Sequence, residues 1–196
     1  MSDVASATVD HDSKTYLGFW IYLMTDCVLF ASLFATYAVL HANTNGGEGA
    51  AGLFDLNFVL LETMILLTSS FFAGMALLSA RRKDAGRALL LYGLVFILGA
   101  AFLALEVSEF RHLALEGNSW RQSAFLSSFF TLVGTHGAHI TVGLLWLATL
   151  AIRVMKRGLG NNTLRQLTLF GMFWHFLDVV WIFIFTIVYL FGVIGV

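Results

Sequence analysis

The chain of 196 residues is 59% hydrophobic and 12% charged, and its formal net charge is −1. A soluble domain is usually about 45–50% apolar and about 25% charged, so this composition excludes an ordinary soluble protein and indicates a polytopic membrane protein. The near-neutral charge gives no reason to expect nucleic acid as a partner. The single cysteine, Cys27, cannot form a disulfide within the chain.

Five apolar runs follow a polar N-terminal stretch, residues 1–16, which we expect to be a tail without the features of a secretion signal. Each run reaches the ~20 residues that cross a bilayer as a helix. The connections between the runs are short and polar. The sequence therefore predicts an all-α membrane protein in which residues 17–196 form a single five-helix transmembrane domain. The predicted helices cover residues 18–40, 58–80, 88–110, 125–152 and 168–193.

The basic residues of the loops predict the orientation in the membrane. Residues 81–87 contain four Lys or Arg and residues 153–167 contain four more, whereas residues 41–57 contain none and residues 111–124 contain two. Because cytoplasmic loops carry the excess of Lys and Arg, the first two of these loops should be cytoplasmic. This places the N-terminus in the cytoplasm and the C-terminus in the periplasm.

Titratable side chains lie inside the apolar runs, where they are costly and normally face protein and a polar partner. Counted at ~1.5 Å per residue along each run, they form a middle-to-inner layer and an outer layer of three glutamates. In the last run, Trp174, Asp178 and Trp181 share one helical stripe with His175 beside it, and we expect this stripe to face protein. The titratable residues are Asp26, Glu62, Glu106, Glu109, His136, His139, His175 and Asp178.

Three pairs within this set are spaced i,i+3 and so share a helical face: His136 with His139, His175 with Asp178, and Glu106 with Glu109. One interpretation is a metal or haem site, for example a bis-histidine haem with His136 or His139 opposite His175. The other is hydrogen bonding between helices, at about 0.6–2 kcal/mol per contact. The second is favoured, because the Glu-x-x-His sequence at residues 109–112 lies at the outer end of the third run, and the outer carboxylates lie too far in depth to join the histidines inside the runs. A proton path is conceivable, but nothing in the sequence bridges the two layers.

Several motifs resemble those of subunit III of the haem–copper oxidases. The run F-W-H-F-L-D-V-V-W at residues 173–181 resembles the W-H-F-x-D-V-V-W signature of that family. The run G-T-H-G-A-H at residues 134–139 resembles its G-x-H-G-x-H motif. Further similar segments are L-E-V-S-E-F at 105–110, L-E-T at 61–63 with L-L-T-S-S at 66–70, and G-F-W-I-Y-L-M-T-D at 18–26. The resemblance extends over residues 16–193. The first and last helices lean toward the ubiquinol-oxidising members of the cytochrome bo type.

This resemblance implies a non-catalytic subunit of a proton-pumping terminal oxidase in a bacterial inner membrane. Such a complex oxidises ubiquinol and reduces oxygen to water. The resemblance implies no redox cofactor or metal in this chain, with haem and copper in subunit I, on which the chain packs. Subunit II and a small subunit IV are further expected partners. Phospholipid is expected in a cleft between the first two helices and the other three, and the chain would support proton uptake.

The resemblance also implies residue roles. His136, His139, His175 and Asp178 would tie the fourth and fifth helices together, and Asp26 would make a similar polar contact between helices. Glu62, Glu106 and Glu109 would line or close the lipid cleft. Arg111 and His112, just beyond the third helix, could bind lipid headgroups or simply be solvated.

Three alternatives stay open at this point. The first is the same role in a bacterial cytochrome c oxidase, because five-helix subunits also occur there. The second is a stand-alone proton- or metal-coupled transporter, which would be active by itself. The third is an integral haem or metal protein, which would bind iron in the isolated chain.

Overall fold

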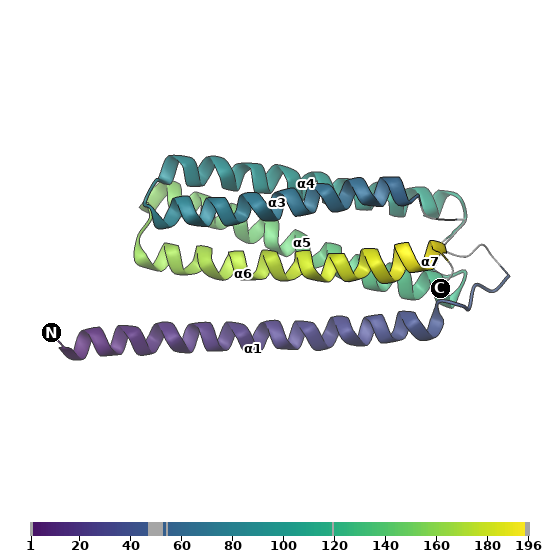
Figure 1. The fold of residues 1–196 in the computed structure, drawn as a ribbon, viewed down its shortest axis with the longest axis horizontal. Coiled ribbons are helices and arrows are strands. Elements are labelled where there is room, and N and C mark those ends of the chain that lie inside the picture. Colours follow the sequence, from purple (N-terminus) through teal and green to yellow (C-terminus); the bar gives the residue numbers. More distant parts are fainter. Residues whose placement is uncertain (1, 47–52, 54, 119, 195–196) are drawn as a thin grey trace.

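The computed structural model describes residues 2–46, 53, 55–118 and 120–194, and for residues 2–12 it describes the backbone only. Long helices run side by side along one direction (Figure 1). They are α1 (Ser2–Leu40), α3 (Leu56–Arg81), α4 (Ala85–Leu115), α5 (Ala124–Arg157) and α6 (Asn161–Ile184), and a π-helical segment η1 (Phe185–Leu190) joins α6 to α7 (Phe191–Ile194). Within these described residues, five helical stretches are long and apolar enough to cross a membrane. The predicted all-α class with five membrane helices is therefore confirmed.

The helices are longer than the apolar runs, because polar residues outside the runs define the helix ends. Asp84 begins α4 by accepting a hydrogen bond from the backbone N–H of Arg87, and Ser123 begins α5 in the same way with Leu126. At the other end of α5, Gly158 adopts a φ of 68°, in the left-handed region that favours glycine. Apolar runs indicate only the part of a helix that matches the hydrocarbon layer, so they underestimated both ends.

The first helix differs most from its predicted bounds. It begins at Ser2, so the polar stretch predicted as a tail is helical and continuous with the membrane-crossing part, Ser13–Leu40. The polar composition of residues 1–16 was a correct guide to where the apolar span begins, but not to where the helix begins.

The packing of the helices places α1 and α3 on opposite sides of the bundle (Figure 1). Helix α3 packs mainly on α4 and also on α6, whereas α1 packs on α5 and to a lesser extent on α6. Helix α5 contacts α4, α6 and α1. The expected division of the first two helices from the other three is therefore wrong, because α1 and α3 pack mainly on different helices, α5 and α4, and both also contact α6.

Large aromatic side chains from α6 fill the centre of the bundle. Trp174 and Trp181 are 1% and 0% exposed, as expected for the aromatic stripe of the last run. Two glycines make room for Trp174. A Cβ atom would lie 2.9 Å from its ring at Gly99 of α4, and 2.9 Å from it at Gly143 of α5. These close approaches let α4, α5 and α6 meet around one indole ring.

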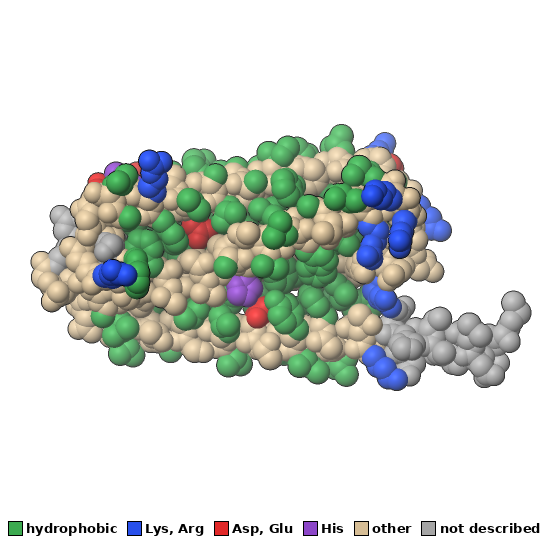
Figure 2. All heavy atoms as spheres, turned by 180° about the vertical axis from the view of Figure 1, so that it is seen from behind, with side chains coloured by type: hydrophobic (Ala, Val, Ile, Leu, Met, Phe, Trp, Pro, Cys, Tyr) green, Lys and Arg blue, Asp and Glu red, His purple; other side chains and the backbone are tan. Residues whose placement is uncertain are grey.

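The outer surface has the character of a membrane-facing bundle. Figure 2 shows hydrophobic side chains along its length, with Lys and Arg side chains gathered mainly at the end where α1 begins. That end carries the connection between α3 and α4, where Arg82 and Lys83 lie between Arg81, the last residue of α3, and Arg87 in the first turn of α4. This distribution agrees with the loop charges on which the predicted orientation rests.

Candidate functional site

His136 of α5 lies at the centre of the bundle in aromatic surroundings. It is fully buried, and its ring stacks on Trp181 of α6 with centroids 5.2 Å apart. The edge of Phe102 of α4 contacts the same histidine, with ring centroids 6.0 Å apart. Neither ring nitrogen has a hydrogen-bond partner among the described residues. His136 thus contacts α6 through ring stacking, and its expected role of tying the two helices together by a polar contact stays a prediction.

His139 lies on the other side of α5 and faces α1. Its Nε2 atom is 3.8 Å from Oδ2 of Asp26, and the two side chains are only 19% and 10% exposed. Its Nδ1 atom is 2.7 Å from the carbonyl oxygen of Thr135, so Nδ1 carries a proton and donates it. An ion pair with Asp26 therefore needs a second proton, on Nε2. The contact joins α5 to α1, whereas we expected His139 to join α5 to the last helix.

Three glutamates and a tyrosine form the outer polar layer between α3, α4 and η1. Glu62 and Glu106 are 0% and 2% exposed, and Glu109 is half-buried. The hydroxyl of Tyr189 donates a hydrogen bond to Oε2 of Glu109 over 3.1 Å. In the part of the chain that the structure describes, both carboxyl oxygens of Glu62 and Oε2 of Glu106 lack a hydrogen-bond partner. Both side chains are buried among the helices and so do not line an open cleft within this chain, whereas the expectation that they close the lipid cleft stays a prediction.

The carboxyl group of Glu106 reaches the turn of α5 that carries the histidines. A Cβ atom at Gly137 would lie 2.6 Å from Oε1 of Glu106, so the carboxyl group packs directly on the backbone there. Glu106 thus reaches the depth of the turn that carries the histidines, although neither ring nitrogen of His136 has a hydrogen-bond partner among the described residues. The apolar run ended at residue 110, but α4 continues to Leu115, so Glu106 lies deeper in the bundle than its position in the run suggested.

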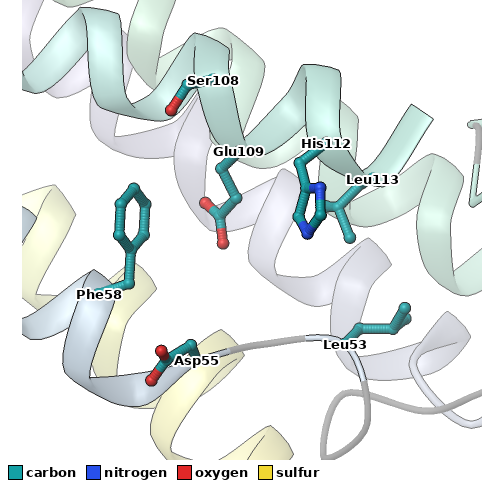
Figure 3. Close-up of a pocket in the computed structure, with 7 residues that line it drawn as sticks. All are labelled: Leu53, Asp55, Phe58, Ser108, Glu109, His112 and Leu113. Carbon is teal, nitrogen blue, oxygen red and sulfur yellow. The ribbon is translucent and has the colours of Figure 1, made fainter. Parts of the chain in front are cut away.

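A cavity of about 340 Å³ opens at the outer end of α3 and α4 (Figure 3). Glu109 and His112 of α4 point into it toward Asp55 and Phe58. Nε2 of His112 also lies 3.3 Å from Oε1 of Glu116, and both of these side chains are exposed. Of the three outer glutamates, Glu109 is the one that lines this cavity.

His175 and Asp178 line a shallow groove of about 420 Å³ between α3 and α6. Nδ1 of His175 is 2.6 Å from the hydroxyl oxygen of Ser70, which lies close to the Asp178 carboxylate as well. The His175 side chain is exposed, and that of Asp178 is half-buried. These contacts join α6 to α3, so the expectation that His175 and Asp178 tie the last two membrane helices together is wrong.

Comparison with known proteins places these features in a family. The family model described as cytochrome c oxidase subunit III matches residues 6–193. The chain belongs to the cytochrome c oxidase subunit III family. It is thus a subunit III of a haem–copper oxidase, a multi-pass membrane subunit without a catalytic centre of its own.

Three relatives are similar over nearly the whole chain. Cytochrome bo(3) ubiquinol oxidase subunit 3 of Pseudomonas putida is 49% identical over 94% of this chain and 90% of its own length. The protein of the same name from Pseudomonas aeruginosa is 53% identical over 93% and 88%. Cytochrome c oxidase subunit 3 of Bacillus sp. PS3 is 47% identical over 97% and 91%. The subunit III family thus includes both quinol and cytochrome c oxidases among the similar proteins.

The structure of this subunit III chain does not bring together the histidines of the metal interpretation. His136 stacks on Trp181 in the core, whereas His175 forms a hydrogen bond with Ser70 at the surface between α3 and α6. Among the residues placed by the structure, no three His, Cys, Asp or Glu side chains are grouped to hold a metal ion.

Two hydroxyl groups of α3 make further polar contacts in this subunit, and neither contact was predicted from the sequence. The indole N–H of Trp174 donates to Oγ of Ser69 over 3.2 Å, and that of Trp181 donates to Oγ1 of Thr63 over 3.0 Å. A buried tryptophan usually needs an acceptor for its N–H, and this rule is the signal that could have indicated them. The sequence could not say which hydroxyl would serve.

Proposed function

We propose that this chain is subunit III of a proton-pumping terminal oxidase that takes its electrons from ubiquinol and reduces oxygen to water. The observation that carries this proposal is the identity of 49% and 53% to two proteins named as ubiquinol oxidase subunits. The motif run at residues 18–26, which leans toward the quinol-oxidising members, supports it as well.

A second candidate is the same role in a cytochrome c oxidase. One relative with that name is 47% identical, only a few per cent below the ubiquinol oxidase subunits. The electron donor binds other subunits of such complexes, so this chain carries little information about it.

The role that we propose is structural and organising. The chain packs on subunit I, which holds the haem and copper, beside subunit II and a small subunit IV. The loop charges support an orientation in a bacterial inner membrane with the N-terminus in the cytoplasm and the C-terminus in the periplasm. We propose that Asp26, His136, His139, His175 and Asp178 act as polar contacts between helices, since each lies against a neighbouring helix or within a polar group shared with one.

For phospholipid binding we propose fewer residues than the sequence suggested. Arg111 and His112 lie at the outer end of α4, where a lipid headgroup can reach them. Glu109 is the glutamate that borders a cavity there. A role for this outer end in proton uptake stays part of the proposal through Glu109.

The electron donor can be tested on the intact complex. This chain is tagged in its own organism, the complex is purified in mild detergent, and oxygen consumption is measured with ubiquinol and separately with reduced cytochrome c. We expect oxygen consumption with ubiquinol only. A strain with the untagged chain, purified identically, is the control for contaminating oxidases. Activity with cytochrome c, together with haem c or copper in a partner subunit other than subunit I, would establish the second candidate.

A further inference from the structure

The groove between α3 and α6 places polar side chains at the middle of the membrane-crossing segments. Ser70 lies near the centre of α3 (Leu56–Arg81), and His175 and Asp178 lie near the centre of the stretch Asn161–Ile194. The groove is open to the surroundings of the bundle, and the His175 ring is exposed in it. We call it the polar groove after Ser70, His175 and Asp178, and its other lining residues are Gly74, Leu67, Phe71 and Met75. It faces whatever surrounds the chain at mid-bilayer depth.

The hydrogen bonds within the groove leave one nitrogen available. If the Ser70 hydroxyl donates to the nearby Asp178 carboxylate, its oxygen accepts the proton of His175 Nδ1. In a neutral imidazole Nε2 is then an acceptor without a proton. No hydrogen bond to Nε2 is present in the described part of the structure. With this arrangement of protons, the exposed end of His175 calls for a hydrogen-bond donor from outside this chain.

Lipid chains cannot supply that donor. An ionisable side chain in the hydrocarbon region normally faces protein or a water-filled cavity, because unsatisfied polar groups there cost several kcal/mol. A second groove, along α1, differs from the polar groove in its lining. It is lined by Leu17, Trp20, Ile21, Met24, Thr25 and Val28, which form a nearly apolar surface that suits lipid.

We infer that the polar groove is an interface for a transmembrane helix of a partner oxidase subunit, and that this helix presents a hydrogen-bond donor to His175. Small residues support a helix as the occupant. Around the Cβ position of Gly74 the nearest group is Nε2 of His175 at 4.0 Å, so a second helix can approach closely there. This inference rests on the proposed function, since it requires that the chain is part of a multi-subunit complex.

Photo-crosslinking from a matched pair of phenylalanines tests the inference. Phe71 of α3 borders the groove and is 65% exposed, whereas Phe96 of α4 is 40% exposed on a helix that contributes nothing to it. Each is replaced in turn by the photoreactive analogue benzoylphenylalanine in the full complex, which is irradiated in native membranes. Adducts are purified through the tag on this chain and sequenced by mass spectrometry.

We expect Phe71 to give an adduct with a transmembrane peptide of a co-purifying oxidase subunit that carries a donor side chain, and Phe96 to give phospholipid adducts. A phospholipid adduct at Phe71, an adduct with a second copy of this chain, or no protein adduct at Phe71 would overturn the inference. Oxygen consumption with ubiquinol, measured on the same complex, separates these outcomes. If it is retained while Phe71 labels only lipid, the interface is wrong and the proposed function stands.

Substitutions of His175 test the predicted donor. His175→Gln keeps an acceptor oxygen near the position of Nε2, whereas His175→Phe keeps the ring size and removes it. We expect His175→Phe to lower the yield of partner subunits per tagged chain about three- to tenfold, and His175→Gln to restore most of it. Equal yields for both variants and the natural chain would contradict a donor from the partner.

Discussion

Two polar regions of the bundle are enclosed in different ways. The outer glutamate layer lies inside this chain, and Glu62 and Glu106 are covered by its own helices although they have few hydrogen bonds. The polar groove has a short hydrogen bond between Ser70 and His175, but it is open to the outside. The first region should therefore govern the stability of the chain, and the second should govern its assembly with partners. The following predictions separate these two effects.

The largest effect is expected for Trp181→Ala in the enclosed core. This substitution removes the stacking on His136 and the hydrogen bond to Thr63, and it leaves a large cavity. We expect the free energy of unfolding of the chain to fall by about 3–5 kcal/mol. Unfolding of the purified chain in increasing sodium dodecyl sulfate measures it. Ile97→Ala, at a position that is 64% exposed, should change it little, and equal effects of the two would contradict the core that we describe.

A smaller loss is expected for Gly137→Ala, where the added methyl group collides with the Glu106 carboxyl group. We expect a destabilisation of about 1–3 kcal/mol in the same measurement. Gly93→Ala is the control, since no described atom lies within 4 Å of its Cβ position. Adding Glu106→Ala to Gly137→Ala should recover part of the loss. If the double variant is as unstable as the sum of the two single variants, the carboxyl group does not pack on α5 at this point.

In the polar groove we expect assembly to change more than stability. Asp178→Ala removes the carboxylate beside Ser70 and His175, at a cost of about 1–2 kcal/mol in contacts between membrane helices. The yield of partner subunits per tagged chain should fall about three- to tenfold. The free energy of unfolding of the isolated chain should fall by less than it does in the Gly137→Ala variant. Assembled complex should keep its haem spectrum. If the Asp178→Ala chain unfolds easily but assembles with its partners at normal yield, the polar groove governs stability and not assembly, which contradicts the comparison.

The smallest effect is expected for Glu109→Gln. The amide oxygen of glutamine can still accept the hydrogen bond from Tyr189, so stability should change by less than about 0.6 kcal/mol. The complex should assemble, and oxygen consumption should persist with at most altered kinetics of proton uptake. Complete loss of oxygen reduction in an intact complex would show that Glu109 has a central role and not a peripheral one.

The sequence predicted the helices and their buried stripe because both depend on local patterns. Trp174 and Trp181 share a stripe seven residues apart, and this spacing alone indicates that they face the same side. The choice of neighbour is a different matter. His139 faces α1 and His175 faces α3 because of how whole helices are arranged, and periodicity within one helix carries no information about that arrangement.

Depth was also only partly predictable. The contact of Glu106 with Gly137 depends on where α4 and α5 end, and those ends are defined by capping residues such as Ser123 outside the apolar runs. Family resemblance indicated the correct subunit, because its W-H-F-x-D-V-V-W signature is long and specific. The same resemblance gave a wrong division of the helices, because a division into groups depends on packing that a motif does not encode.

The central claim is that this chain organises an oxidase without holding a redox centre itself. The most direct measurement is the optical spectrum and the haem content of the tagged chain, purified once with its partners and once after expression alone. The account predicts haem and copper only when larger partner subunits are present, and none with the isolated, monodisperse chain. Stoichiometric haem or metal in the isolated chain would contradict it and would make the buried histidines ligands.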